Sequence, residues 1–169
     1  ALDGDGNGLP GGEFNFWFRA VSPVGVAATG APKTIFVDKD NTAANPNGSL
    51  ANPHRSVQTA MAAALPGDVV RFVGSAGLDR NLATVNDNIP YEFGDGGPGK
   101  GALADGARLA VPKGVTLMVD AGAILKFGGS QLVVGSSDAS KDSSGAALQV
   151  LGIPGREVYF TSHFDESLG

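Results

Sequence analysis

Residues 114–135 read GVTLMVDAGAILKFGGSQLVVG, and this stretch decides the fold class. Within it, the runs 115–119, 123–127 and 132–134 alternate inward apolar residues with outward ones. Such alternation predicts β-strands, because successive side chains of a strand point to opposite faces. Asp-Ala-Gly and Gly-Gly-Ser corners separate the runs, where hairpins would have two-residue turns. The pattern therefore predicts a β-solenoid, in which successive strands coil around one core.

The composition fits a chain of many short strands and tight corners. The 169 residues include 26 glycines, 17% are charged and 42% are hydrophobic, which predicts a folded chain. A net charge of −5 without any Lys/Arg cluster argues against nucleic acid as a partner. No apolar run is long enough for a transmembrane helix, so we expect no membrane insertion. The lack of cysteine excludes disulfides and thiolate metal sites.

Three parts follow one another along the chain. Residues 1–21 are a loop and then a strand over 13–21, EFNFWFRAV, whose phenylalanines share one face. Residues 22–33, SPVGVAATGAPK, are a linker rich in Pro, Gly and Ala. Residues 34–169 are predicted to form the cap and first coils of the solenoid. The chain is expected to be a piece of a large exported bacterial protein, secreted or on the cell surface.

One helix is predicted, over residues 57–65. Ser56 is placed to cap its start, and apolar residues recur from Val57 at the i, i+3, i+4 and i+7 positions. The dipeptide formed by Pro66 and Gly67 is expected to end it.

Beyond the helix, a strand is predicted over 68–74 and irregular structure over 75–109. The solenoid pattern is expected to begin at Leu109 and to continue through 147–151 and 157–162. The predicted core consists of Val115, Leu117, Val119, Leu125, Phe127, Leu132, Val134, Leu148, Val150, Val158 and Phe160.

The order TIFVD, NGSLANP, SVQTAMAAAL and PGDVVRFV resembles the entry of right-handed parallel β-helix proteins of the pectate-lyase-like superfamily. The later runs resemble the coils of the same fold, and the resemblance covers residues 34–162. It implies a short strand and a helix that cap the first coil. Residues 1–21 separately resemble the last loop and strand of bacterial immunoglobulin-like modules.

Asp3, Asp5 and Asn7, followed by a glycine, form D-x-D-x-N-G, the first half of a calcium loop of the EF-hand type. Alternate oxygens can converge on one Ca²⁺ there. Glu13 is the candidate for the remaining ligand, although it lies one residue before the usual position. The alternative is a solvated loop between strands.

A second oxygen-rich loop carries Asp38, Asp40, Asn41, Asn45 and Asn47. Its predicted role is structural, because Asx side chains accept hydrogen bonds from nearby backbone groups in turns. A second Ca²⁺ site is the alternative.

Catalytic groups are sparse. His54 and His163 are far apart, have no metal or triad spacing, and are expected on the surface. The charged residues of the coils do not form the carboxylate pair that glycosidic cleavage requires, and are expected to be solvating charges. They are Lys113, Asp120, Lys126, Asp138, Lys141, Asp142, Arg156 and Glu157.

These observations favour a non-catalytic structural or adhesive segment with a calcium-stiffened entry loop. Its expected partners are copies of itself or neighbouring modules, contacted through the strand at 13–21 and the open solenoid end. Two alternatives stay open: the front end of a carbohydrate-active β-helix enzyme, either a polysaccharide lyase or a glycoside hydrolase, and a module that binds glycans without cleaving them.

Overall fold

A computed structural model describes residues 32–77, 79, 81–135 and 142–169 of the chain. The predictions for the loop and strand of residues 1–21, and for most of the linker, lie outside the described residues.

The described part is mainly β and forms a solenoid of about three turns. One parallel sheet has the order β1 (Thr34–Val37), β2 (Val69–Phe72), β5 (Thr116–Asp120) and β8 (Ala147–Leu151). A second contains β3 (Tyr91–Gly94), β6 (Ile124–Gly128) and β9 (Tyr159–Ser162). A short third pair is β4 (Leu109–Ala110) with β7 (Leu132–Val133). The helices are α1 (Val57–Ala63) and a single 3-10 turn, Val85–Asp87.

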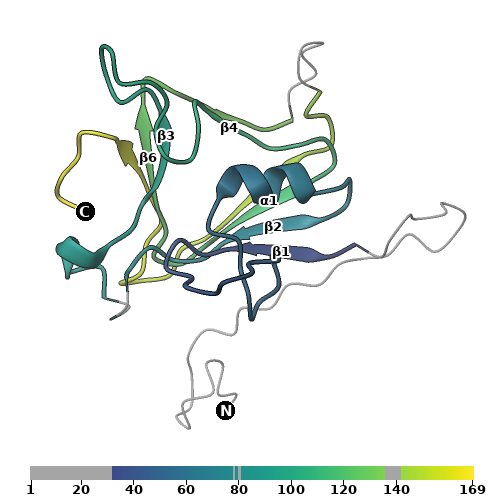
Figure 1. The fold of residues 1–169 in the computed structure, drawn as a ribbon, viewed down its shortest axis with the longest axis horizontal. Helices are drawn as coiled ribbons and strands as arrows, with labels where there is room; N and C mark the ends of the chain where they lie inside the picture. Colours follow the sequence, from purple (N-terminus) through teal and green to yellow (C-terminus); the bar gives the residue numbers. More distant parts are fainter. Residues whose placement is uncertain (1–31, 78, 80, 136–141) are drawn as a thin grey trace, which may run out of the picture. The chain divides into compact units, whose positions relative to one another are not determined.

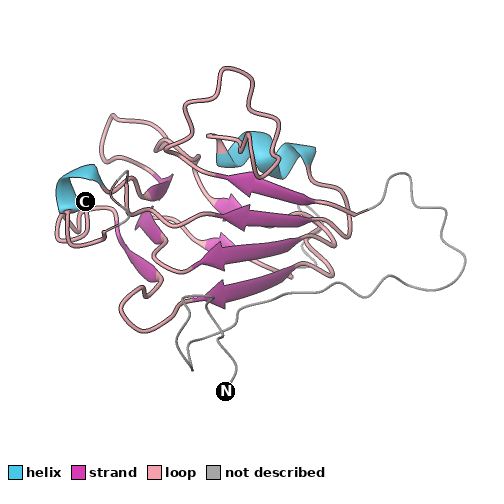
Figure 2. Ribbon diagram, turned by 90° about the horizontal axis from the view of Figure 1, so that it is seen from below, coloured by secondary structure: helices cyan, strands magenta, loops and turns pink. Residues whose placement is uncertain are grey.

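Figure 2 shows the strands of the first sheet as adjacent arrows that point the same way. Each coil adds one strand to the first sheet and one to the second, so that β2, β5 and β8 begin successive coils. Equivalent residues therefore stack in rows. The two inward rows of the first sheet are Ile35–Val70–Leu117–Leu148 and Val37–Phe72–Val119–Val150.

The core lies inside the coils and is densely aromatic. The rings of Phe72 and Tyr91 stack with centroids 4.5 Å apart, and Phe93 stacks on Phe127 at 5.6 Å. The Tyr91 hydroxyl is buried but donates to the carbonyl of Val73 at 2.8 Å. This bond satisfies the one polar atom that the ring brings inside.

Helix α1 caps the first coil (Figure 1). The Ser56 Oγ accepts a hydrogen bond from the Thr59 amide at 3.2 Å, as predicted, and Val57 and Ala60 are buried in the core. The helix ends two residues earlier than expected, because Ala64 is already extended ahead of Pro66.

Asp68 stabilises the turn that follows the helix. Its buried carboxylate accepts hydrogen bonds from the amides of Leu65 at 3.0 Å and Lys33 at 2.9 Å. Both carboxylate oxygens therefore accept backbone amides, one from the turn after the helix and one from the residue before β1.

The irregular structure predicted over 75–109 is wrong in part. Strand β3 lies there, with Tyr91 and Phe93 fully buried, and pairs in register with β6. The solenoid therefore begins with β1 and β2 and not at Leu109. The four-residue run Tyr91–Gly94 is too short for its alternation to stand out in the sequence.

The predicted core is confirmed in the first two coils and wrong at the end of the third. Val115, Leu117, Val119 and Leu125 are buried, and Phe127, Leu132, Val134, Leu148 and Val158 pack partly buried against them. Val150 and Phe160, however, are each 46% exposed. Both face the interior, but among the described residues no further coil lies beyond them.

Candidate functional site

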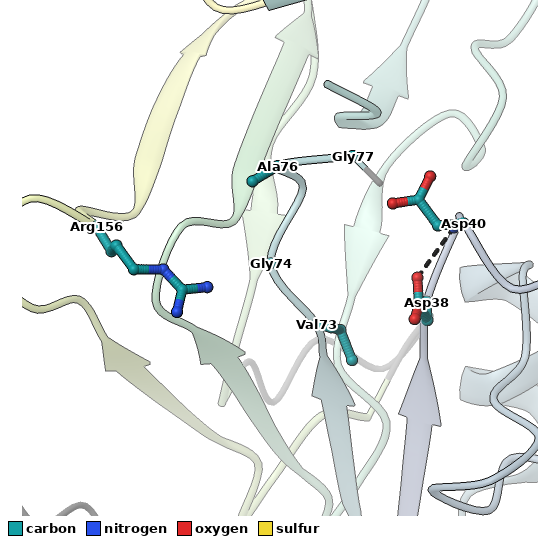
Figure 3. Close-up of a pocket in the computed structure, with 7 residues that line it drawn as sticks. All are labelled: Asp38, Asp40, Val73, Gly74, Ala76, Gly77 and Arg156. Carbon is teal, nitrogen blue, oxygen red and sulfur yellow. Dashed lines mark hydrogen bonds between the residues drawn. The ribbon is translucent and has the colours of Figure 1, made fainter. Parts of the chain in front are cut away.

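A pocket of about 310 Å³ lies where the strands of the first sheet end (Figure 3). Asp38 follows β1, Val73 and Gly74 follow β2, and Arg156 lies beyond β8, so segments far apart in the sequence line one pocket. Gly74 and Gly77 have no side chain, so the pocket is lined by their backbone atoms at these two positions. The lining residues are Asp38, Asp40, Val73, Gly74, Ala76, Gly77 and Arg156.

One wall of the pocket is acidic. The Asp38 Oδ1 accepts a hydrogen bond from the Asp40 amide at 3.0 Å, which holds both residues in one turn. The pKa of Asp40 is raised above its ordinary value, chiefly by burial and then by the negative charges of Asp38 and Asp87. Asp40 can therefore hold a proton at a higher pH than an ordinary aspartate.

The opposite wall carries a guanidinium. Arg156 points toward the pocket in Figure 3, and its Nη2 donates a long hydrogen bond of 3.4 Å to the Ala121 carbonyl. No carboxylate of the described part pairs with it within ion-pair distance. The pocket thus presents opposite charges across one hollow.

Beside the pocket, Arg71 and Asp120 form an ion pair between neighbouring strands, in which one guanidinium nitrogen contacts both carboxylate oxygens. The Arg71 Nε lies 2.9 Å from both carboxylate oxygens, and its guanidinium also covers the Phe36 ring at 5.6 Å. Burial raises the pKa of Asp120 overall, against the lowering effects of Arg71 and Arg156. This pair links two coils structurally.

The oxygen-rich loop has the predicted structural role. Asn41 Oδ1 accepts from the Ala43 amide at 2.9 Å, and Asn47 Oδ1 accepts from the Ser49 amide at 3.0 Å. In the part of the chain that the structure describes, no group of three or more His, Asp or Glu side chains is arranged to hold a metal ion. The candidate calcium ligands Asp3, Asp5, Asn7 and Glu13 lie outside the described residues.

Lys126 is not the solvating charge that was predicted. It is only 2% exposed, and its Nζ donates to the carbonyls of Asp165, at 2.7 Å, and Gly169. The alternation of β6 places Lys126 on the outer face of the sheet, but residues 163–169 fold back over it. The buried ammonium is thus stabilised by backbone oxygens that the sequence alone does not place nearby.

Two further groups of polar contacts lie on the same sheet as Lys126. Thr161 Oγ1 donates to Asp165 Oδ2 at 2.6 Å, and hydrogen bonds from Ser167 and Thr161 lower the pKa of Asp165 to about 2. His163 Nδ1 lies 3.1 Å from Glu92 Oε1. His163 and His54 are both half-buried and not fully on the surface as predicted. These contacts hold residues 163–169 against the outer face of the second sheet.

Sequence reasoning named Asp38, Asp40 and Arg156 but did not bring them together. Asp38 and Asp40 were assigned to a loop, and Arg156 was expected to be a solvating charge of the coils. The feature of the sequence that could have indicated their proximity is that each follows a strand of the same sheet: Asp38 follows β1 and Arg156 follows β8. Only the register between the strands of successive coils shows that these two positions lie close together.

Comparisons with protein-family models, with curated proteins and with solved structures found no match. Among the residues that the structure describes, no helix is both long and apolar enough to cross a membrane.

The raised pKa of Asp40 gives a direct test of the pocket. We expect Asp38→Asn to lower the pKa of Asp40, because the substitution removes a negative charge and leaves an oxygen to accept the Asp40 amide hydrogen bond. Asp87→Asn should act in the same direction with a smaller effect, since Asp87 contributes least. Titration followed by carbon-detected NMR of the carboxyl groups measures both. An unchanged Asp40 titration in Asp38→Asn would contradict the arrangement of the acidic wall.

Proposed function

We propose that the chain is a non-catalytic structural or adhesive segment of a large secreted or cell-surface protein. The observation that supports this most is how the charged side chains are used. Lys39 and Asp105 pair at 2.6 Å, and the Asp105 carboxylate also accepts the Glu92 amide at 2.7 Å. Such groups are engaged in holding coils together, and a catalytic site needs acids and bases that are left available to substrate.

The same use of charge recurs in each coil. Arg71 binds Asp120 across two strands, and Lys126 binds the backbone of residues 163–169. Lys113 pairs with Asp142 at 2.6 Å on the surface. Together with the continuous inward rows, these contacts support a rigid scaffold. Its partners would be copies of itself or neighbouring modules, reached through the open solenoid end and the strand predicted at 13–21.

Membership of the pectate-lyase-like superfamily, and the immunoglobulin-like module before it, are part of the same proposal. The order of cap strand, helix and coils supports the first. The alternating aromatic strand at 13–21 supports the second. Calcium binding by Asp3, Asp5, Asn7 and Glu13 would stiffen the entry loop, and the motif D-x-D-x-N-G supports it.

A second candidate function is glycan binding or cleavage at the corner pocket. The mixed charges of Asp40 and Arg156 favour it, because carboxylates and guanidinium groups both form hydrogen bonds with hydroxyl-rich ligands. It ranks second because Asp38, the other carboxylate of the pocket, lies in the same turn as Asp40, accepts its amide, and does not stand on the opposite wall, where Arg156 lies.

One experiment compares the two functions. The chain is incubated with acidic and neutral polysaccharides in Ca²⁺ and in EDTA, and new reducing ends, unsaturated products and melting temperature are measured. We expect no turnover, and a higher melting temperature in Ca²⁺. Asp5→Asn should abolish the calcium shift, whereas Asp79→Asn, which removes an equal charge from an exposed loop, should preserve it.

Turnover that is lost in both Asp40→Asn and Arg156→Ala would overturn the non-catalytic proposal. Equal melting temperatures in Ca²⁺ and EDTA would contradict the calcium proposal and leave the structural role standing.

A further inference from the structure

Two lysine–aspartate pairs of the described residues have the same separation but different surroundings. Lys39 Nζ lies 2.6 Å from Asp105 Oδ2, and these side chains are only 15% and 3% exposed. Lys113 Nζ also lies 2.6 Å from Asp142 Oδ2, but these side chains are 60% and 49% exposed. An amine and a carboxyl group in contact away from water are the two reactants of an amide bond. The buried pair meets this condition and the exposed pair does not.

The surroundings of Lys39 limit the access of water to the contact. The ring of Tyr91, which is 1% exposed, lies 5.9 Å from Lys39 Nζ. The Pro90 carbonyl accepts a hydrogen bond from the same nitrogen at 2.8 Å, which fixes the position of Nζ. Burial favours condensation, because a buried ion pair has lost the solvation of both charges and a neutral amide does not carry this cost.

The Asp105 carboxyl group is held in a fixed orientation. Its Oδ2 accepts the Glu92 amide at 2.7 Å as well as the Lys39 ammonium. The Asp105 amide in turn donates to the Glu92 carbonyl at 2.9 Å, so the backbone and the side chain of Asp105 both bind β3. Because Oδ2 is bonded to Cγ, Nζ lies no more than one C–O bond length further from Cγ than from Oδ2. Reacting groups held this close have a high effective concentration.

We propose that Lys39 and Asp105 form an intramolecular amide crosslink by condensation of the Lys39 Nζ with the Asp105 Cγ. The bond joins residues 66 positions apart and closes a loop that contains α1, β2 and β3. The chain has no cysteine, so no disulfide can supply such a crosslink. The inference rests on the proposed structural function and specifies a covalent link within the scaffold.

The step releases one water molecule and needs no other reactant. One ammonium proton passes to Oδ2 along the 2.6 Å contact, which leaves a neutral amine. The lone pair of Nζ attacks Cγ, and a second Nζ proton passes to Oδ2 as the Cγ–Oδ2 bond breaks with both electrons on the oxygen. The third proton stays on the amide nitrogen. The Glu92 amide, which donates to Oδ2, stabilises the charge on this oxygen as it leaves.

Mass spectrometry of the folded, purified chain tests the proposal. We expect an intact mass lower than that of the sequence by one water molecule, and a branched peptide that contains residues 39 and 105 after proteolysis. Lys39→Arg should abolish the loss of water, because a guanidinium keeps the positive charge beside Asp105 but stays protonated and is no nucleophile. Lys113→Arg is the matched control, since it changes the exposed pair of equal separation, and it should keep the loss of water.

A loss of water at Asp105 has one other chemical source. Asp105 precedes a glycine, and attack of a glycine amide on the preceding aspartate side chain gives a cyclic imide with the same mass. The Gly106 amide donates to the Leu103 carbonyl at 2.9 Å, which disfavours this route in the fold. The two products differ in chemistry: the imide forms without Lys39 and is opened by hydroxylamine, whereas the crosslink needs Lys39 and resists hydroxylamine.

A folded chain that keeps its full mass after prolonged incubation would overturn the proposal. A loss of water that persists in Lys39→Arg, or that maps to Lys113 and Asp142, would overturn it as well. Circular dichroism checks that Lys39→Arg is folded, and peptide mapping of the unsubstituted chain decides the outcome even where that variant fails to fold. None of these results bears on the non-catalytic role, which the polysaccharide experiment tests separately.

Discussion

Gly94→Ala is expected to lower the free energy of unfolding by on the order of 4 kcal/mol, the largest effect of any small substitution considered. Gly94 has a φ of +120°, a conformation that residues with a side chain rarely adopt. A Cβ there would also overlap the carbonyl oxygen of Gly128, its partner on β6, with the carbonyl carbon at 2.7 Å. That oxygen accepts the Asp95 amide at 2.8 Å, so Gly128 cannot move without breaking this bond.

Gly97→Ala separates the two causes. Gly97 has a similar φ of +112°, but no atom lies within 4 Å of its added Cβ. Its cost should be that of backbone strain alone, about 1–3 kcal/mol. Chemical denaturation followed by circular dichroism gives both values. Equal costs for the two variants would mean that β3 and β6 do not approach as closely as described.

Leu117→Ala is expected to cost about 3 kcal/mol of stability. Leu117 is fully buried in the middle coil, and Val70 and Leu148 are its neighbours in the inward row. Removing its side chain leaves a cavity that the flanking coils, held by the ladder hydrogen bonds, cannot close. The same denaturation experiment measures the loss.

Leu148→Ala is the matched control, because Leu148 occupies the same row one coil later and is only half-buried. We expect a cost of about 1 kcal/mol, since less apolar surface leaves the interior. Equal losses for Leu117→Ala and Leu148→Ala would contradict the different burial of the two side chains.

The elements that sequence analysis found are those whose signal is local. The strands around Val115 and Leu125 were predicted because their alternation is long enough to show a period of two. Helix α1 was predicted because its cap and its apolar stripe fall within one short stretch.

The errors have physical causes. Tyr91 and Phe93 belong to a strand because β6 lies beside them, and that partner is distant in sequence. Lys126 is buried because residues 163–169 cover it, which no property of its neighbours in β6 indicates. Val150 has the sequence pattern of a core residue, but its exposure depends on whether another coil covers it.

The sequence by itself determined the fold class, because the side-chain alternation and the glycine corners that produce a solenoid are properties of short stretches. Only the tertiary structure decided that Asp40 and Arg156 share a pocket, that Lys126 is buried, and that the loop 48–54 pairs with the outer edge of β1. Each of these depends on register between coils and on loops that fold back over them. Such contacts join residues far apart in the chain, so local patterns carry no record of them.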